Sequence, residues 1–127
     1  MIEKIYTQKA PQPIGPYSQA IKSAGKLIFI SGQIPIDPET GKLIEGGIKE
    51  QTERVIENIK SILESQSLSL KNIVKCEVFL KDISLFKEFN EVYSQYFKEI
   101  KPARTTVAVA GLPADALIEI SAIAVYE

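Results

Sequence analysis

The chain has 127 residues, 45% of them hydrophobic and 24% charged, a balance typical of a globular protein with a single domain over residues 1–127. Fifteen lysines and arginines against 16 acidic residues give a net charge of −1, which argues against a nucleic-acid partner. No histidine and only one cysteine occur, so a Ser-His-Asp triad, a histidine-rich metal site and an internal disulfide are excluded. The apolar runs are too short to span a bilayer and the N-terminus lacks an apolar signal segment, so we expect a cytoplasmic protein without a membrane partner.

The N-terminal third is predicted to form a loop followed by a β-hairpin. Residues 8–17 contain three prolines and a glycine, a composition that favours an irregular loop over a helix. Strands are predicted over residues 18–23 and 27–31, joined by a turn at residues 24–26. Residues 35–47 are predicted to form a second loop.

The rest of the chain alternates between helical and strand patterns. Apolar residues recur at helical spacing over residues 48–66, and they alternate with polar ones over the predicted strand 73–81. Ser84 is predicted to cap a second helix that ends before Lys101-Pro102. Two last strands, 104–110 and 117–126, are expected to form a hairpin around Pro113. This order predicts an α+β fold with a mostly antiparallel sheet and two helices on one face.

Two of these strands are apolar on both faces, which two helices on one side cannot cover. Residues 27–30 have no polar side, and neither does the last strand apart from Glu119 and Ser121. Strands of this kind are usually packed against other structure on both faces. We therefore predict that the second face is buried against other subunits.

Arg104 and Glu119 are the strongest candidates for chemistry. Arg104 opens a strand after Pro102-Ala103, and its planar guanidinium can bind a carboxylate through two hydrogen bonds, although many such arginines are simply solvated. Glu119 lies between two isoleucines, where it either forms a structural ion pair or holds a water or proton. In the expected hairpin, Glu119 lies opposite Ala108 on the face of Arg104, roughly 13 Å along the sheet. A register slip of one residue would place the two on opposite faces.

Weaker candidates lie in loops and at element ends. Tyr17 ends the proline-rich loop and could cap a pocket or simply pack, and Ser31-Gly32 allows close backbone approach to a ligand or is a plain turn. Asn90 lies beside the apolar flank of the second helix, facing either a pocket or solvent. Cys76 is expected to be a small core residue.

Taken together, six blocks of sequence resemble the signature of the Rid (formerly YjgF) family of reactive intermediate deaminases, and they occur in the family's order along nearly the whole chain. The blocks are Gly15-Pro16-Tyr17-Ser18-Gln19-Ala20, Ile30-Ser31-Gly32-Gln33-Ile34-Pro35, Val74-Lys75-Cys76-Glu77-Val78-Phe79-Leu80-Lys81-Asp82, Phe89-Asn90-Glu91-Val92-Tyr93, Pro102-Ala103-Arg104 and Ile118-Glu119-Ile120.

The resemblance implies a chorismate-mutase-like fold and a homotrimer with clefts between subunits. It implies an activity of the 2-iminobutanoate/2-iminopropanoate deaminase type, in which 2-aminoacrylate, 2-aminocrotonate and their imines are hydrolysed to 2-keto acids and ammonia. Such intermediates are released by pyridoxal-phosphate dehydratases, while the deaminase itself needs no cofactor or metal.

By the same resemblance, Arg104 binds the substrate carboxylate and Glu119 positions the attacking water. Tyr17, Ser31, Gly32 and Asn90 line the cleft. Thr106 stands at a substrate-binding position where some members carry cysteine, which removes a reactive thiol, and Ser121 stands where some members carry an acidic residue.

Three other functions remain open from the sequence. A regulatory trimer that binds small carboxylates without turnover is the first, but members without deaminase activity tend to lose the arginine. An endoribonuclease or translation inhibitor is the second, and the net charge argues against it. A chorismate-mutase type of enzyme is the third, and it usually needs several cationic groups.

Overall fold

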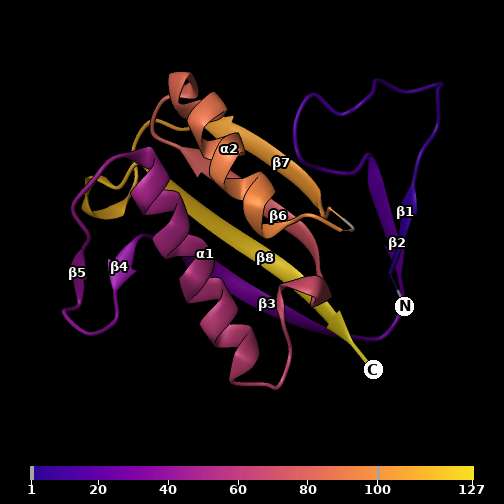
Figure 1. Cartoon of the computed structure of the whole chain (residues 1–127), viewed down its shortest axis with the longest axis horizontal. Helices are drawn as coiled ribbons and strands as arrows, with labels where there is room; N and C mark the ends of the chain where they lie inside the picture. The colour runs from indigo at the N-terminus through magenta and orange to yellow at the C-terminus, as the bar shows by residue number, and fades with distance from the viewer. Residues whose placement is uncertain (1, 100) are drawn as a thin grey trace.

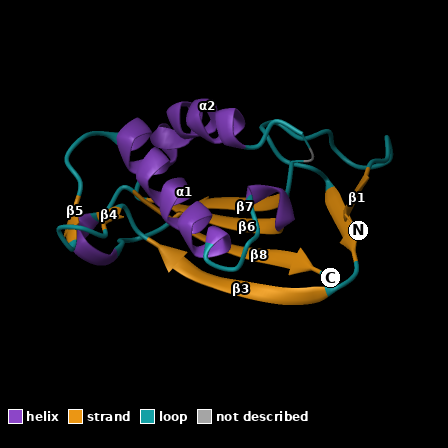
Figure 2. Ribbon diagram, turned by 60° about the horizontal axis from the view of Figure 1, so that its bottom comes forward, coloured by secondary structure: helices purple, strands orange, loops and turns teal. Residues whose placement is uncertain are grey.

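The computed structural model describes residues 2–99 and 101–127. Two α-helices lie on one face of a four-stranded sheet, and two small two-stranded sheets flank it (Figures 1 and 2). The elements in chain order are β1 (Ile2–Ile5), β2 (Ala20–Ser23), β3 (Lys26–Gln33), β4 (Ile36–Asp37), β5 (Lys42–Leu43), α1 (Ile48–Glu64), η1 (Leu70–Asn72), β6 (Ile73–Leu80), η2 (Ile83–Leu85), α2 (Phe86–Tyr96), β7 (Ala103–Ala108), η3 (Pro113–Asp115) and β8 (Ile118–Tyr126). The predicted α+β fold, with a mostly antiparallel sheet and two helices on one face, is confirmed.

The main sheet has the strand order β3-β8-β6-β7. β8 pairs antiparallel with both β3 and β6, whereas β6 pairs parallel with β7. The parallel pair follows from the connection, because the chain crosses back through α2 between these two strands. β8 and β6 are therefore the interior strands of the sheet, and β3 and β7 form its two edges.

The helix α1 presents its apolar side to the sheet, as its spacing predicts. Its buried residues pack with those of β6 and β8 in one core: Ile48, Val55, Ile56, Ile59, Leu63, Val78, Leu80, Ile118 and Ile120. At its N-terminus, Glu50 Oε1 accepts a hydrogen bond of 2.8 Å from the Gly47 backbone, which satisfies a donor that the helix leaves unpaired. This helix therefore anchors the fold by burial of its apolar stripe.

The second helix is shorter than predicted at both ends. Ser84 does not cap α2: Leu85 precedes the helix without a side-chain capping bond, and Asp82 Oδ1, which accepts from the Ser84 backbone at 2.8 Å, caps the preceding turn η2. α2 already ends at Tyr96, because Phe97 leaves helical geometry and turns its ring into the core. The prediction that the helix continues to Lys101-Pro102 was wrong.

The first predicted hairpin was also wrong. β2 pairs with β1, in the register Ile2↔Ser23 to Ile5↔Ala20, and β3 pairs instead with β8. Gly25 has a φ of +135°, and a side chain there would collide with the backbone of Tyr126 at the end of β8. At this glycine the chain leaves β2 and enters β3, which pairs with β8. The predicted turn at residues 24–26 is therefore the point where the chain passes from the β1-β2 sheet into the four-stranded sheet. The strand β1 was not predicted.

The second predicted hairpin fails for a related reason. β7 and β8 are not neighbours, because β6 lies between them. The more polar β7, with Arg104 and Thr105, occupies one edge of the sheet, while β8 lies in its interior.

The face of the sheet away from the helices carries exposed apolar side chains. Leu27 is 52% exposed, Phe29 71% and Val107 41%. Both α-helices lie on the opposite side of the sheet (Figure 2). As predicted, the described residues leave apolar side chains on one face of the sheet without any helix to cover them. Neither α1 nor α2 is long and apolar enough to cross a membrane.

Candidate functional site

Arg104 is placed by the start of β7 and by the proline-rich loop. It pairs with Cys76 of β6, whose side chain is buried beneath α2, so Arg104 shares the face that the helices cover. The Ser18 backbone donates to the Pro102 carbonyl at 3.1 Å, and Ser18 bridges to Ala103 in parallel. These contacts bring the end of the loop next to Arg104.

Four aromatic rings surround the guanidinium of Arg104. Its Cζ lies 4.9 Å from the ring centroid of Tyr93, 5.0 Å from those of Phe89 and Tyr17, and 5.7 Å from that of Phe86. Three of these rings come from α2 and one from the loop. Because the faces of aromatic rings attract cations, this cage holds the charge without neutralising it.

The charge of Arg104 has no acidic partner in the described part of the chain. No carboxylate of residues 2–99 or 101–127 forms an ion pair with it, and its Nη1 and Nη2 are buried without a hydrogen-bond partner in the protein. Burial lowers the pKa of the guanidinium, and nearby Tyr93, Tyr17 and Cys76 act against that shift. An arginine nevertheless stays protonated in proteins. The result is a cation with unused donors, suited to a carboxylate.

Other unpartnered polar atoms gather around the same point. Among the described residues, six buried side-chain atoms lack a hydrogen-bond partner: Thr52 Oγ1, Asn90 Oδ1, Tyr93 Oη, Arg104 Nη1, Arg104 Nη2 and Thr106 Oγ1. All except Thr52 belong to β7, which carries Arg104, or to the neighbouring helix α2. Buried polar groups are normally paired, so their concentration here indicates a place where a polar ligand or water completes the bonding.

The loop segment Gly15–Tyr17 covers Arg104. A side chain at Gly15 would begin 3.2 Å from Arg104 Nη2 and 3.3 Å from Asn90 Nδ2, so only glycine fits without displacing them. Tyr17 is held by its own loop, since its hydroxyl accepts from the Ile14 backbone at 3.2 Å. Outside this cover, a shallow hollow of about 640 Å³ is lined by Gly15, Phe86, Asn90 and neighbouring residues.

Glu119 lies on the other face of the sheet. It pairs with Phe79, whereas Arg104 pairs with Cys76, and positions 76 and 79 on β6 point to opposite sides. The prediction that Glu119 shares the face of Arg104 was therefore wrong, because it assumed that β7 and β8 were adjacent. Within one chain the sheet separates the two groups.

Glu119 instead forms a second cluster with Ser31 and Gly32. The register of β3 shifts between Ile30 and Gln33, so Ser31 and Gly32 form a bulge beside β8. A side chain at Gly32 would collide with the carboxylate of Glu119, which therefore lies directly against the Gly32 backbone. The glycine is needed here for close approach.

The structure thus divides the predicted site residues into two groups. Tyr17, Asn90, Arg104 and Thr106 lie between α2 and β7, while Ser31, Gly32 and Glu119 lie on the open face near β3. The sequence analysis did not identify the ring cage, to which α2 contributes Phe86, Phe89 and Tyr93. Their spacing on the side next to Asn90 was the available signal. Cys76 is buried as predicted.

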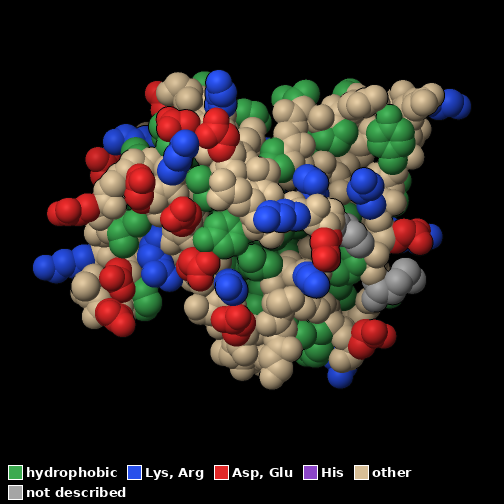
Figure 3. Space-filling view, viewed as in Figure 1, with side chains coloured by type: hydrophobic (Ala, Val, Ile, Leu, Met, Phe, Trp, Pro, Cys, Tyr) green, Lys and Arg blue, Asp and Glu red, His purple; other side chains and the backbone are tan. Residues whose placement is uncertain are grey.

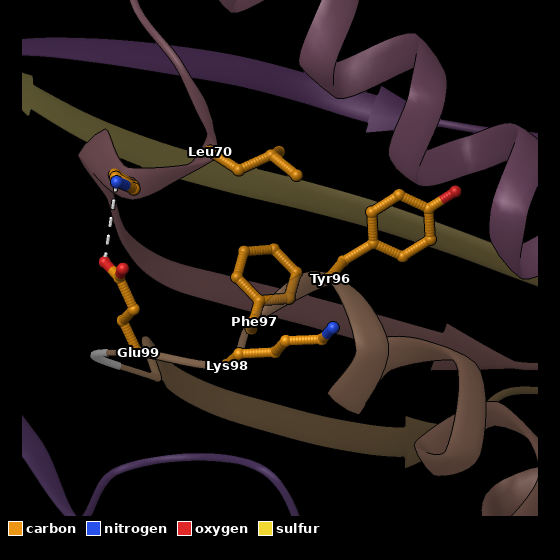
Figure 4. A pocket seen from close by; sticks show the side chains of 6 residues that line it. Leu70, Tyr96, Phe97, Lys98 and Glu99 are labelled. Carbon is orange, nitrogen blue, oxygen red and sulfur yellow. Dashed lines mark ion pairs between the residues drawn. The ribbon is translucent and has the colours of Figure 1, made fainter.

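A separate pocket lies at the other end of α2 (Figure 4). It has a volume of about 410 Å³ and is lined by Leu70, Lys71, Tyr96, Phe97, Lys98 and Glu99. Lys71 already has an acidic partner there, at 3.7 Å from Glu99. None of the predicted site residues lines this pocket. Among residues 2–99 and 101–127, no three His, Cys, Asp or Glu side chains gather closely enough to hold a metal ion.

Comparison with known proteins assigns the chain to a family. Residues 7–126 match the family model described as Endoribonuclease L-PSP. A RutC family protein of Pyrococcus abyssi is 62% identical over 125 residues, which cover 98% of each chain. Reactive Intermediate Deaminase A, chloroplastic, of Arabidopsis thaliana is 45% identical over 122 residues, covering 96% of this chain and 65% of that protein. The crystal structure of E. coli TdcF with bound serine matches with a TM-score of 0.76 at 41% identity, covering 98% of this chain and 99% of that one. The protein is a member of the Rid/YjgF/RutC (Endoribonuclease L-PSP) family.

Proposed function

We propose that this protein hydrolyses reactive enamines and imines derived from amino acids, such as 2-aminoacrylate and 2-aminocrotonate, to 2-keto acids and ammonia. The observation that carries the proposal is the buried guanidinium of Arg104, which has no acidic partner in the described chain and two unpaired nitrogens. A substrate carboxylate supplies the missing counter-charge and accepts both hydrogen bonds. The names of two relatives agree with it: the plant protein is called a reactive intermediate deaminase, and the E. coli protein binds serine.

The chemistry needs positioning more than a strong nucleophile. Arg104 holds the carboxylate, which fixes the neighbouring C=N carbon of the imine. An enamine first becomes this imine by gaining a proton at the terminal carbon of its C=C bond and losing one from its nitrogen. A water molecule held by Glu119 adds its oxygen to that carbon while a proton passes to the nitrogen, giving a carbinolamine. The carbinolamine then loses ammonia as its hydroxyl proton leaves, and the C=O bond of the 2-keto acid forms. Glu119 serves as the proton carrier, so neither histidine nor a cofactor is required.

Arg104 and Glu119 can act on one molecule only if different copies of the chain supply them. They lie on opposite faces of the sheet within one chain. The open face that carries Glu119 also carries the exposed Phe29 and Leu27, a surface suited to burial against another copy. We therefore propose a homotrimer with clefts between subunits, each pairing the Arg104 cluster of one copy with the Glu119 cluster of another.

Access to Arg104 requires a local movement. Its two Nη atoms are buried under the Gly15–Tyr17 segment. Either this segment shifts outward or the arginine side chain turns out of its cage when substrate arrives. The ring faces hold the guanidinium of Arg104 in place until it binds the substrate carboxylate.

The decisive test is a coupled assay in which a pyridoxal-phosphate serine or threonine dehydratase generates the enamine and release of keto acid is followed. We expect wild-type protein to accelerate release, and Arg104→Ala to lower kcat/KM by about 100-fold or more, because the substrate carboxylate loses a charged, bidentate partner. Arg54→Ala is the matched control, since Arg54 lies on α1 and bonds Asn58 Oδ1 at 3.1 Å, remote from the cage. Full activity of Arg104→Ala would contradict the proposal that Arg104 binds the substrate carboxylate.

Two alternatives remain as outcomes of this test. Carboxylate binding that depends on Arg104, without acceleration over buffer, would identify a regulatory binder of small carboxylates. The family description also names an endoribonuclease. The net charge of −1 and the mixture of acidic and basic side chains on the helix face (Figure 3) argue against a nucleic-acid surface. RNA binding that weakens steeply with salt would favour that activity instead.

A further inference from the structure

We propose that Gln19 is a positioning residue that holds a flap, residues 12–17, closed over Arg104, and that this flap opens as a unit to admit a carboxylate. The inference rests on the proposed function, since it assumes that a carboxylate binds Arg104. It identifies which of the two possible movements exposes the buried nitrogens of Arg104, and it gives a role to a residue that does not touch them.

The side chain of Gln19 ties together the base of the loop between β1 and β2 (Figure 1). Its Oε1 accepts from the Thr7 backbone at 2.8 Å, and its Nε2 donates to the carbonyls of Thr7 at 3.0 Å and Pro11 at 2.9 Å. A longer bond of 3.3 Å reaches the Ala10 carbonyl. One side chain therefore fixes residues 7–11 against the position where the loop closes, as in compact surface loops packed by their own side chains.

Ser18 anchors the other end of the flap to the start of β7. Its side chain is buried, its backbone donates to the Pro102 carbonyl at 3.1 Å, and its hydroxyl donates to the Lys101 carbonyl. Between Pro11 and Ser18, residues 12–17 form no hydrogen bond with any other part of the chain that the structure describes. The flap is therefore fixed at both ends but not along its length.

Inside the flap, two hydrogen bonds and two prolines preserve its shape. The Ile14 backbone donates to the Tyr17 hydroxyl at 3.2 Å, and the Tyr17 backbone donates to the Gly15 carbonyl at 2.9 Å. Pro13 and Pro16 restrict the backbone further, because their rings fix φ. These bonds need not break when the segment swings about its two ends, so it can move as one piece.

Opening the flap breaks fewer contacts than turning Arg104 out of its cage. The flap contributes one ring, that of Tyr17, whereas α2 contributes the other three. An outward turn of the arginine loses all four rings, while an outward swing of the flap loses one. The flap also removes the room for a ligand, since a side chain at Gly15 would begin only 3.2 Å from Arg104 Nη2. Its opening uncovers that nitrogen while the rings of α2 hold the guanidinium in place.

A flap that is closed in the free protein lowers the apparent affinity for a carboxylate. Only the open fraction of molecules binds, so the measured Kd rises as that fraction falls. Loss of the Gln19 bonds frees the base of the loop and increases the open fraction. Removal of Gln19 is therefore expected to tighten binding, whereas loss of a residue that merely supports the fold of the site would weaken it.

Titration calorimetry with 2-aminobutanoate, a stable amino acid, tests this without relying on turnover. Gln19→Met removes the hydrogen bonds at similar size, and we expect it to bind about threefold or more tightly than wild type. Gln66→Met is the matched control, because the Gln66 side chain bonds only Ser65 just beyond α1. This control should bind like wild type.

A fluorescent reporter follows the flap itself. The chain contains no tryptophan, and Ile14 in the flap is 81% exposed, so Ile14→Trp adds a single fluorophore with little loss of packing. We expect its emission to change on addition of 2-aminobutanoate and to saturate over the same concentrations as the calorimetric signal. Ile83→Trp, at a 58% exposed position on η2, is the control and should not respond.

The outcomes separate the flap from the proposed function. Equal or weaker binding by Gln19→Met, or a silent Ile14→Trp while the ligand binds, would overturn the role of the flap and leave Arg104 as the binding residue. If Gln19→Met fails to fold, the response of Ile14→Trp decides. Lack of binding to wild type, or binding that survives Arg104→Ala, would overturn the proposed function as well.

Discussion

Arg104 is stabilised by the faces of aromatic rings. Most buried arginines are instead stabilised by an ion pair with a carboxylate. An ion pair within the protein would hold the side chain but would also occupy the donors that a ligand needs. The cage of Tyr17, Phe86, Phe89 and Tyr93 orients the group and leaves its hydrogen bonds available. The residue is therefore prepared for an anionic ligand before one arrives.

Beneath this site, Cys76 is a thiol whose protonation is linked to folding. Burial raises its pKa to about 11, while nearby Tyr93, Arg104 and Lys75 partly oppose that rise. In the unfolded chain the thiol ionises near its ordinary value of about 8.5. The folded state thus holds the proton more tightly, so its contribution to stability is complete below about pH 8.5 and is lost as the pH rises towards about 11.

We therefore expect the free energy of unfolding of wild type to fall by about 2 kcal/mol more than that of Cys76→Ala between about pH 8 and about pH 10.5. Urea unfolding of both proteins at the two pH values measures this, and the variant accounts for the other groups that titrate. Parallel losses in the two proteins would show that the thiol titrates normally in the fold.

Among the elements, the bulge of β3 connects backbone geometry to the candidate site. It places Gly32 against the carboxylate of Glu119, where any side chain would collide. The collision is with the end of the Glu119 side chain, so the strand itself can remain while the carboxylate moves. Gly32 is thus a positioning residue for Glu119.

Gly32→Ala is expected to lower kcat by about tenfold or more with little change in KM, because it displaces the carboxylate proposed to hold the water and leaves Arg104, the proposed substrate anchor, in place. The same coupled assay measures this, with Gly111→Ala as control, since nothing lies within 4 Å of a side chain at that glycine. An unchanged kcat would mean that the position of Glu119 does not limit the reaction.

For the whole molecule, the separation of Arg104 and Glu119 by the sheet is the dominant feature. Neither residue can complete a site with the other in its own chain. In the proposed assembly, a second copy binds the uncovered apolar face with Leu27 and Phe29. Assembly and catalysis are then expected to depend on each other.

Mixing two inactive variants tests this dependence. Arg104→Ala and Glu119→Gln would be unfolded together in equal amounts and refolded, so that copies assort at random. A cleft that takes one residue from each of two copies is intact with a probability of about one quarter, so about a quarter of wild-type activity should return. Each variant refolded alone is the control. No recovery, or a clean monomer by gel filtration with light scattering, would contradict a site shared between copies.

The success of the sequence predictions differed between local and long-range features. The helix over residues 48–66 and the strand over 73–81 were close to the observed α1 and β6, because side-chain periodicity reports which face of an element is buried. Both predicted hairpins were wrong, because neighbouring strands in the sequence were assumed to be neighbours in the sheet. Pairing depends on the total burial of the sheet, which placed β8 in the interior and β7 at the edge.

The sequence by itself determined the helices, most strands, the lack of histidine chemistry and the residue types available for catalysis. It also determined that one face of the sheet lacks cover, because an apolar pattern on both sides of a strand is a local property. Only the tertiary structure decided that Arg104 and Glu119 lie on opposite faces, since that depends on which strand stands between them. It alone decided that α2 and the loop enclose Arg104, because those contacts join residues far apart along the chain.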